Sequence, residues 1–259
     1  MYHDVVPAGE EDASGFPGCD ASLYKVTPEL FDRHLAAIGR LVARPAHPAR
    51  PALPAPVITF DDGGGSAMAA AEALGRHGFV GHFFITTNYI GARGFVAESD
   101  IRELNQRGHV IGSHSCSHPL RMGHCAWPQL VDEWTKSRSR LADILGSNVD
   151  MASVPGGDFA LPVAEAAARA GFTHLFTSEP TLETRYAFGL ALHGRFAIHR
   201  WTTAETASAL VAGAWLPCAR QAVVWNAKKI SKRIGGERYL QLRRLLLGQG
   251  NEVRWGDQR

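Results

Sequence analysis

The sequence carries little net charge, few cysteines and no long apolar run. Its 27 Lys and Arg against 25 Asp and Glu leave a formal charge of +2 over 259 residues, so no overall field draws it to nucleic acid or to an anionic membrane. The four cysteines form no Cys-x-x-Cys pair, which argues against a disulfide scaffold. No apolar run approaches the ~20 residues of a membrane-spanning helix.

The N-terminal stretch MYHDVVPAGEEDASG lacks the basic start and the apolar core of a secretory signal peptide. We therefore expect a cytoplasmic protein. Hydrophobic residues make up 45% of the chain and charged residues 20%, a balance that is ordinary for a globular protein with a sizeable core. Nothing in the composition indicates an oligomeric state.

Three regions follow one another along the chain. Residues 1–56 are expected to form a short strand, a helix that starts at Thr27-Pro28 and a proline-rich connector, all packed on the core. Residues 57–205 alternate strand and helix with short loops, which favours a mostly parallel α/β sheet or barrel. In such folds reactive side chains lie in loops at the C-terminal ends of strands. Residues 206–259 are expected to form a basic, helical tail.

The basic character of the tail is concentrated in residues 226–259, where nine Lys or Arg face three acids, a local charge of +6. Tyr239, Leu242 and Leu246 have the spacing of an apolar helix stripe. Two interpretations stay open: a docked helix with its basic face in solvent, or a contact with a membrane surface or another polyanion.

Two motifs bring metal-binding side chains to strand ends. VITFDDG is predicted to form a buried strand that runs into adjacent carboxylates, Asp61 and Asp62. HVIGSHSCSHP is a strand followed by His114 and His118. Two histidines and a carboxylate are a common ligand set for a catalytic divalent metal, which would account for Asp62. Asp61 would then be placed as a general base beside the water that such a cation activates.

Each motif alone has a plainer interpretation. Asp-Asp-Gly after a strand is usually a turn or a helix cap, and a histidine pair at this spacing more often belongs to the surface or the core. Their joint occurrence at successive strand ends of one α/β chain is much less expected by chance. The combination therefore favours the metal site.

These residues resemble the motifs of the polysaccharide deacetylases, metal-dependent carbohydrate esterases that act on N-acetylated sugars. Thr59-Phe60-Asp61-Asp62-Gly63 is similar to their first motif, and the segment from His114 to Pro119 to their second. The likeness covers roughly residues 57–205, and Tyr2-His3 resembles the start of many members. It implies Asp61 as catalytic base, with Asp62, His114 and His118 binding one divalent ion, for which zinc is the first choice. The fold it implies is an irregular (β/α) barrel of about seven parallel strands.

The third motif of the family departs from its usual form here. An arginine that holds the catalytic aspartate is expected where this chain has Ser153. Arg195 or Arg200 is then expected to supply the cation, unless Asp61 is tuned differently. Pro155 and Gly157 still fit as walls of a substrate groove, although the segment also fits a plain turn.

The last family motif supplies a general-acid histidine on a late strand. His193 and His199 both lie in suitable contexts, and neither matches cleanly. We take His199 as the candidate acid, with His193, or no histidine at all, as the open alternatives.

The resemblance implies a hydrolase that removes N-acetyl groups from an acetylamino-sugar polysaccharide or its precursor, in exopolysaccharide or cell-surface glycan assembly. Two alternatives remain. A non-catalytic glycan-binding protein of the same fold would explain the missing arginine, and a same-fold amidohydrolase would act on a small non-sugar amide.

Overall fold

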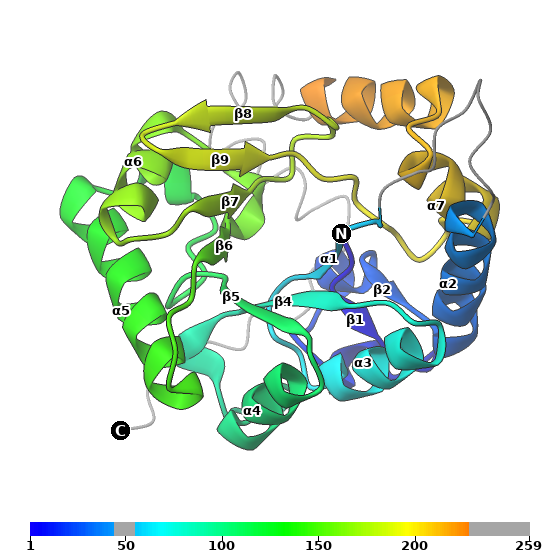
Figure 1. Cartoon of the computed structure of the whole chain (residues 1–259), viewed down its shortest axis with the longest axis horizontal. Helices are drawn as coiled ribbons and strands as arrows, with labels where there is room; N and C mark the ends of the chain where they lie inside the picture. Colours follow the sequence, from blue (N-terminus) through cyan, green and yellow to red (C-terminus); the bar gives the residue numbers. More distant parts are fainter. Residues whose placement is uncertain (44–54, 228–259) are drawn as a thin grey trace.

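The computed structural model describes residues 1–43 and 55–227 (Figure 1). Most of the proline-rich connector and the tail from residue 228 onward, with its expected apolar stripe, lie outside the described residues. The boundaries expected at residues 56 and 205 stay predictions.

A seven-stranded sheet with the order β3-β4-β5-β6-β7-β9-β8 curls into a half-barrel (Figure 1). The strands are β3 (Ile58–Phe60), β4 (Gly81–Ile85), β5 (Val110–Ser113), β6 (Met151–Ser153), β7 (His174–Phe176), β8 (Thr184–Ala187) and β9 (Leu190–His193). Neighbours from β3 to β9 pair in parallel, as the strand–helix alternation predicts. The exception in this mostly parallel sheet is β8, which a short turn at Phe188-Gly189 pairs antiparallel with β9.

Helices connect the parallel strands and lie around the outside of the curled sheet (Figure 1). They are α3 (Ala67–Arg76), α4 (Glu98–Gln106), α5 (Trp127–Leu145) and α6 (Leu161–Arg169). The 3₁₀ turns are Glu11–Ala13, Thr87–Tyr89, Met122–His124 and Pro155–Gly157. Proline in the first turn starts α5, and Gly146, with a left-handed φ of 65°, ends it.

The core lies between this sheet and its helices. Trp134 of α5 is fully buried, stacks edge-on against Phe172 and donates a hydrogen bond from Nε1 to the Val163 carbonyl at 3.1 Å. Phe83 and Leu141 are also buried, with 1% or less of each side chain exposed. Each large apolar side chain buried in this way stabilises the fold by about 1.5–3 kcal/mol.

The N-terminal segment adds a further parallel neighbour beside β3. β1 (Asp4–Val5) pairs with β2 (Lys25–Val26), and Tyr2 bridges to Phe60. The Tyr2 amide donates to the Thr59 carbonyl at 2.7 Å, and the Asp61 amide donates to the Tyr2 carbonyl at 3.1 Å. The Tyr2 ring stacks on Phe60, so by alternation His3 lies on the same side as Asp61.

Three further helices flank this segment. α1 (Cys19–Ser22) is a single turn, and α2 (Pro28–Val42) packs against α7 (Ala204–Val211). Thr27 caps α2 by accepting a hydrogen bond from the Leu30 amide, as its sequence predicts. A last described helix spans Trp215–Ala227.

Over residues 1–43 and 55–227 no single helix is long and apolar enough to cross a membrane. The bent pair Ala204–Val211 and Trp215–Ala227, which meets at 93°, reaches the threshold by length and composition only.

A buried lysine holds the loop between β1 and β2. Lys25 is 4% exposed, and its Nζ donates to the carbonyls of Glu11, Ser14 and Phe16 at 2.6, 2.6 and 2.7 Å. The Asp4 carboxylate lies 3.9 Å away and supplies the opposite charge. Burial lowers the pKa of Lys25, and the charge of Asp4 opposes that shift. The chain thus closes the loop around one cation.

We expect Lys25→Met to lower the free energy of unfolding by about 3 kcal/mol, because three carbonyls and a carboxylate lose their buried partner. Urea unfolding measures the change. Lys136→Met removes an exposed lysine from a surface pair and should leave the urea midpoint nearly unchanged. Equal midpoint shifts for the two variants would contradict the buried-cation interpretation.

Candidate metal centre

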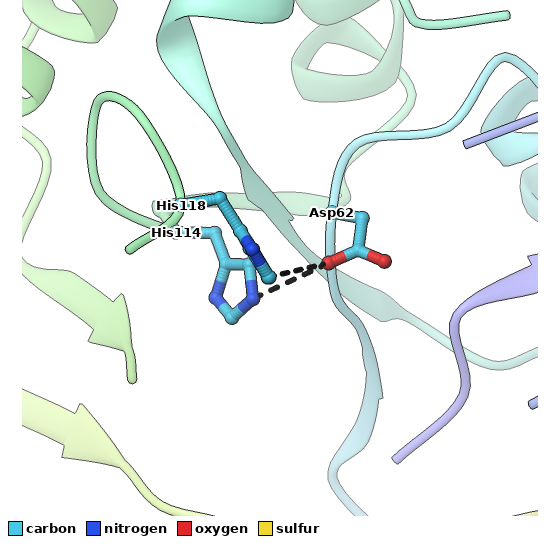
Figure 2. Close-up of side chains that lie close together, drawn as sticks. All are labelled: Asp62, His114 and His118. Carbon is cyan, nitrogen blue, oxygen red and sulfur yellow. Dashed lines mark ion pairs between the residues drawn. The ribbon is translucent and has the colours of Figure 1, made fainter. Parts of the chain in front are cut away.

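The structure brings Asp62, His114 and His118 together at the C-terminal edge of the sheet (Figure 2). Asp62 follows β3, and both histidines follow β5. Asp62 Oδ1 lies 3.4 Å from Nε2 of His114 and 3.4 Å from Nε2 of His118, and one ligand atom from each residue falls within 4.8 Å of the others. Two imidazole nitrogens and a carboxylate oxygen fit a zinc-like divalent cation and leave positions open for other ligands. The role of these residues as ligands stays a prediction.

The backbone at this site is held in a conformation that most residues avoid. Asp62, Ser115 and His118 have φ values of 76°, 64° and 58°. Left-handed backbone at non-glycine residues is unfavourable and collects at functional sites. Gly63 has a φ of 81°, and a Cβ at Gly64 would collide with the Asp4 carboxylate, which explains the first two glycines after the acid pair.

A buried glutamate supports the histidine loop. Glu133 on α5 is 8% exposed and accepts hydrogen bonds from the amides of Cys116 and Ser117, both at 2.9 Å, and from the Ser117 hydroxyl at 2.5 Å. A hydrogen bond to the backbone fixes the orientation of the His114 ring. Its Nδ1 donates to the Ser153 carbonyl at 3.0 Å, which leaves Nε2 facing Asp62. The sequence offered no signal for Glu133.

Arg195 holds Asp61 in the way that the family arginine is expected to do. Its guanidinium donates to Asp61 Oδ1 at 2.7 Å and to Oδ2 at 2.9 Å, and to the Ser153 hydroxyl at 2.7 Å. Ser153 donates in turn to Asp61 Oδ1 at 3.2 Å. Arg195 and Asp61 are 6% and 3% exposed, whereas Arg200 pairs with Glu11 at 3.3 Å. Of the two cations weighed from the sequence, Arg195 is the partner.

The charges around the acid pair keep both carboxylates ionised. Burial pushes the pKa of Asp61 upward, but Arg195 and then His114 outweigh it and hold the pKa at about 2. Burial likewise opposes ionisation of Asp62, yet hydrogen bonds with His114 and His118 keep its pKa well below the usual range. Burial lowers the pKa of His118, and its bond to Asp62 raises it by more.

His3 is a site residue that the sequence left without a partner. It lies beside Asp61 through the Tyr2–Phe60 bridge. Burial lowers the pKa of His3, and the charges of Asp62 and Asp61 oppose that shift. Its Nδ1 is buried and has no hydrogen-bond partner. The Tyr2-His3 pair at the head of the sequence was the available signal, but its position beside Asp61 required the strand pairing.

The two histidines weighed as general acid lie elsewhere. His199 stacks against Tyr24 at 4.9 Å and Trp201 at 5.0 Å. His193 stacks on His174, with Nε2 3.0 Å from the Nδ1 of that ring. Neither contact involves the acid pair, and the assignment of either as the acid stays a prediction.

Pro155 and Gly157 directly follow β6 at the same sheet edge. Pro155 is buried, and Gly157 has a left-handed φ of 65°. A Cβ at Gly156, between them, would come within 3.0 Å of the Leu120 carbonyl, so this turn packs closely against the loop after His118. Their contact with substrate stays a prediction.

Residues 53–175 match the family model described as polysaccharide deacetylase. Over 161 residues, 62% of this chain, the sequence is 26% identical to the Bacillus subtilis protein named "Putative polysaccharide deacetylase YxkH", covering 55% of it. Over 124 residues, 47% of this chain, it is 27% identical to the peptidoglycan-N-acetylmuramic acid deacetylase PdaA of the same organism, covering 45% of it. The chain spans about half the length of these curated relatives.

The fold is similar to that of the Streptococcus pyogenes deacetylase PplD, solved in complex with acetate. The TM-score is 0.61 at 22% sequence identity, and the match covers 79% of this chain and 93% of that chain. This likeness confirms the expected irregular barrel, and the family match confirms the resemblance seen in the motifs.

We expect the purified chain to bind one zinc ion per molecule, with the affinity lowered more than about 100-fold by His114→Ala. Calorimetric titration with zinc measures the affinity and stoichiometry. His174→Ala removes a histidine outside the cluster and should bind zinc as the wild type does. Equal affinity of the wild type and His114→Ala would contradict the site.

We expect Arg195→Met to destabilise the chain by about 3–5 kcal/mol, because it strands the buried Asp61 charge. In an Asp61→Asn background, Arg195→Met should lower the free energy of unfolding by on the order of 2 kcal/mol less than in the wild type. Urea unfolding of the four variants gives the coupling. Arg200→Met is the surface control, and equal costs in both backgrounds would mean that the pair contributes no coupling.

Proposed function

We propose that this chain, whose residues 53–175 match the polysaccharide deacetylase family model, is a metal-dependent hydrolase of N-acetyl groups on an acetylamino-sugar polymer or its precursor. Proteins of this family are hydrolases of carbon–nitrogen bonds other than peptide bonds. The observation that carries the proposal is the Asp62–His114–His118 cluster beside an arginine-held Asp61.

Asp62, His114 and His118 would hold the divalent cation, and zinc suits their donor set best. When bound, the cation would polarise the acetamide carbonyl and lower the pKa of the attacking water. The lower pKa of the water matters because Asp61, with its low pKa, is a weak base.

Asp61 accepts a proton from the attacking water. Its carboxylate is ionised at neutral pH, and the two bonds from Arg195 fix its orientation. Asp61 Oδ1 accepts from both Arg195 and Ser153, whereas Oδ2 accepts only from Arg195, so a lone pair on Oδ2 remains for the water. Ionisation and position together make Asp61 the general base.

We assign the proton donor for the leaving nitrogen to His3 in place of His199. Its buried Nδ1 lacks a partner within the described chain, and its ring lies beside Asp61. A buried ring nitrogen without a partner is costly unless a ligand completes it. In its protonated form His3 can pass a proton to the nitrogen as the carbon–nitrogen bond breaks, so that acetate and a free amine leave.

We place the substrate among exopolysaccharides or cell-surface glycans. The name of the relative PdaA, a peptidoglycan-N-acetylmuramic acid deacetylase, supports a cell-surface sugar polymer. The absent motif arginine favoured a non-catalytic glycan-binding protein, and Arg195 now supplies an arginine at that carboxylate.

We expect Asp61→Asn and His3→Ala each to lower kcat for acetate release from N-acetylglucosamine oligomers by about 10²–10⁴-fold. The loss reflects the missing base in one variant and the missing donor in the other. Acetate is quantified with zinc-loaded protein. His193→Ala serves as the matched histidine control and should retain wild-type kcat.

Three outcomes redirect the proposal. If the protein bound one zinc ion per molecule but released no acetate from a broad panel of acetylated sugars, peptides and small amides, the proposal that it is an enzyme would be overturned. Release from small non-sugar amides alone would favour the amidohydrolase. If His193→Ala or His199→Ala lowered kcat and His3→Ala did not, the proton donor would be that histidine and not His3.

A further inference from the structure

A row of four aromatic rings leads from the candidate site to the surface. His3 lies 4.8 Å from Tyr24, Tyr24 lies 4.9 Å from His199, and His199 lies 5.0 Å from Trp201, measured between ring centroids. His199 and Trp201 are stacked, with 12° between their ring planes. Trp201, at the outer end, is 62% exposed. The proposed function uses only the first ring.

The strand register places this row along the mouth of the barrel. His3 lies beside Asp61 because Tyr2 bridges to Phe60. Tyr24 is the lateral neighbour of His3, since β1 and β2 pair in parallel with Asp4 opposite Lys25. The next neighbour is the 199–201 segment, because the Arg200 amide donates to the Leu23 carbonyl at 2.9 Å. Successive rings therefore continue outward from the acid pair at one level of the sheet.

An open groove of about 370 Å³ lies beside Trp201, where α2 meets the start of α7. Arg33, Arg200 and Glu205 supply charged groups to its wall, and Leu30 supplies an apolar side chain. In Figure 1 α2 and α7 lie side by side.

We propose that Trp201 and this groove form a distal sugar-binding subsite, continuous with the candidate active site. The inference rests on the proposed function and deepens it: the substrate is an oligosaccharide or a polymer, bound across several sugar units, and not a single acetylated sugar. The acetylated unit lies at Asp61 and His3, and a neighbouring part of the same chain lies over Trp201.

The chemistry of the groove suits a sugar chain. A pyranose ring presents an apolar C–H face that packs on an aromatic plane, and Trp201 offers a large exposed one. Hydroxyl groups at the ring edge accept from arginine and donate to carboxylate, which Arg33, Arg200 and Glu205 provide. An open groove with charges of both signs admits a polymer that passes through and gives an anionic surface little net attraction.

The test compares substrate lengths. We measure kcat/KM for acetate release from the disaccharide and the hexasaccharide of N-acetylglucosamine with zinc-loaded, full-length protein. Trp201→Ala should lower the ratio of hexasaccharide to disaccharide kcat/KM about tenfold, as expected when an aromatic anchor is lost. Trp215→Ala removes a tryptophan that is 80% exposed on the helix Trp215–Ala227, and it should keep the wild-type ratio.

A binding measurement separates the subsite from the reaction. In the Asp61→Asn background, Trp201→Ala should weaken hexasaccharide binding about tenfold and Trp215→Ala should not. Weakened binding with no acetate release by the wild type would support the subsite while the proposed function fails. Acetate release with an unchanged length ratio and unchanged binding in Trp201→Ala would overturn the subsite while the proposed function stands.

Discussion

The buried ion pair between Asp61 and Arg195 is the interaction on which the mouth of the barrel depends. Two adjacent carboxylates, 3% and 7% exposed, would repel each other and resist burial without a compensating cation. Arg195 supplies that cation to Asp61, and its remaining donors reach the Thr177 carbonyl and Thr59. The guanidinium thereby ties the ends of β3, β7 and β9 together. Because Arg195 compensates the charge of Asp61, Asp62 is free to pair with His114 and His118.

The N-terminal segment completes the site from the other side. Its first residues extend the sheet and bring His3 beside the acid pair, while the loop that Lys25 closes carries Phe16. The Phe16 ring lies 4.7 Å from the ring of His118, so the loop packs directly on a metal-ligand candidate. A stretch that the sequence marks only as a lead-in therefore supplies a wall of the site and the start of the aromatic row.

The sequence predicted those parts of the site that local patterns specify. Asp62, His114 and His118 could be expected to meet because each follows a strand of one parallel sheet, whose carboxyl ends share an edge. The helices α2 and α5 could be placed from Thr27-Pro28 and from Trp127-Pro128 with Gly146. Strand β8 was missed, since its antiparallel pairing depends on a turn that no strong local signal marks.

By itself, then, the sequence determined the strand–helix order, the acid pair and the histidine pair, because hydrophobic periodicity and adjacent motifs are local properties of the chain. Only the tertiary structure decided which cation faces Asp61, which histidine lies beside it, and which rings continue outward to Trp201. Arg195 is 134 residues from Asp61 along the chain, and His3 reaches Asp61 only through a strand pairing. Such contacts follow from sheet register and barrel closure, which no local pattern encodes.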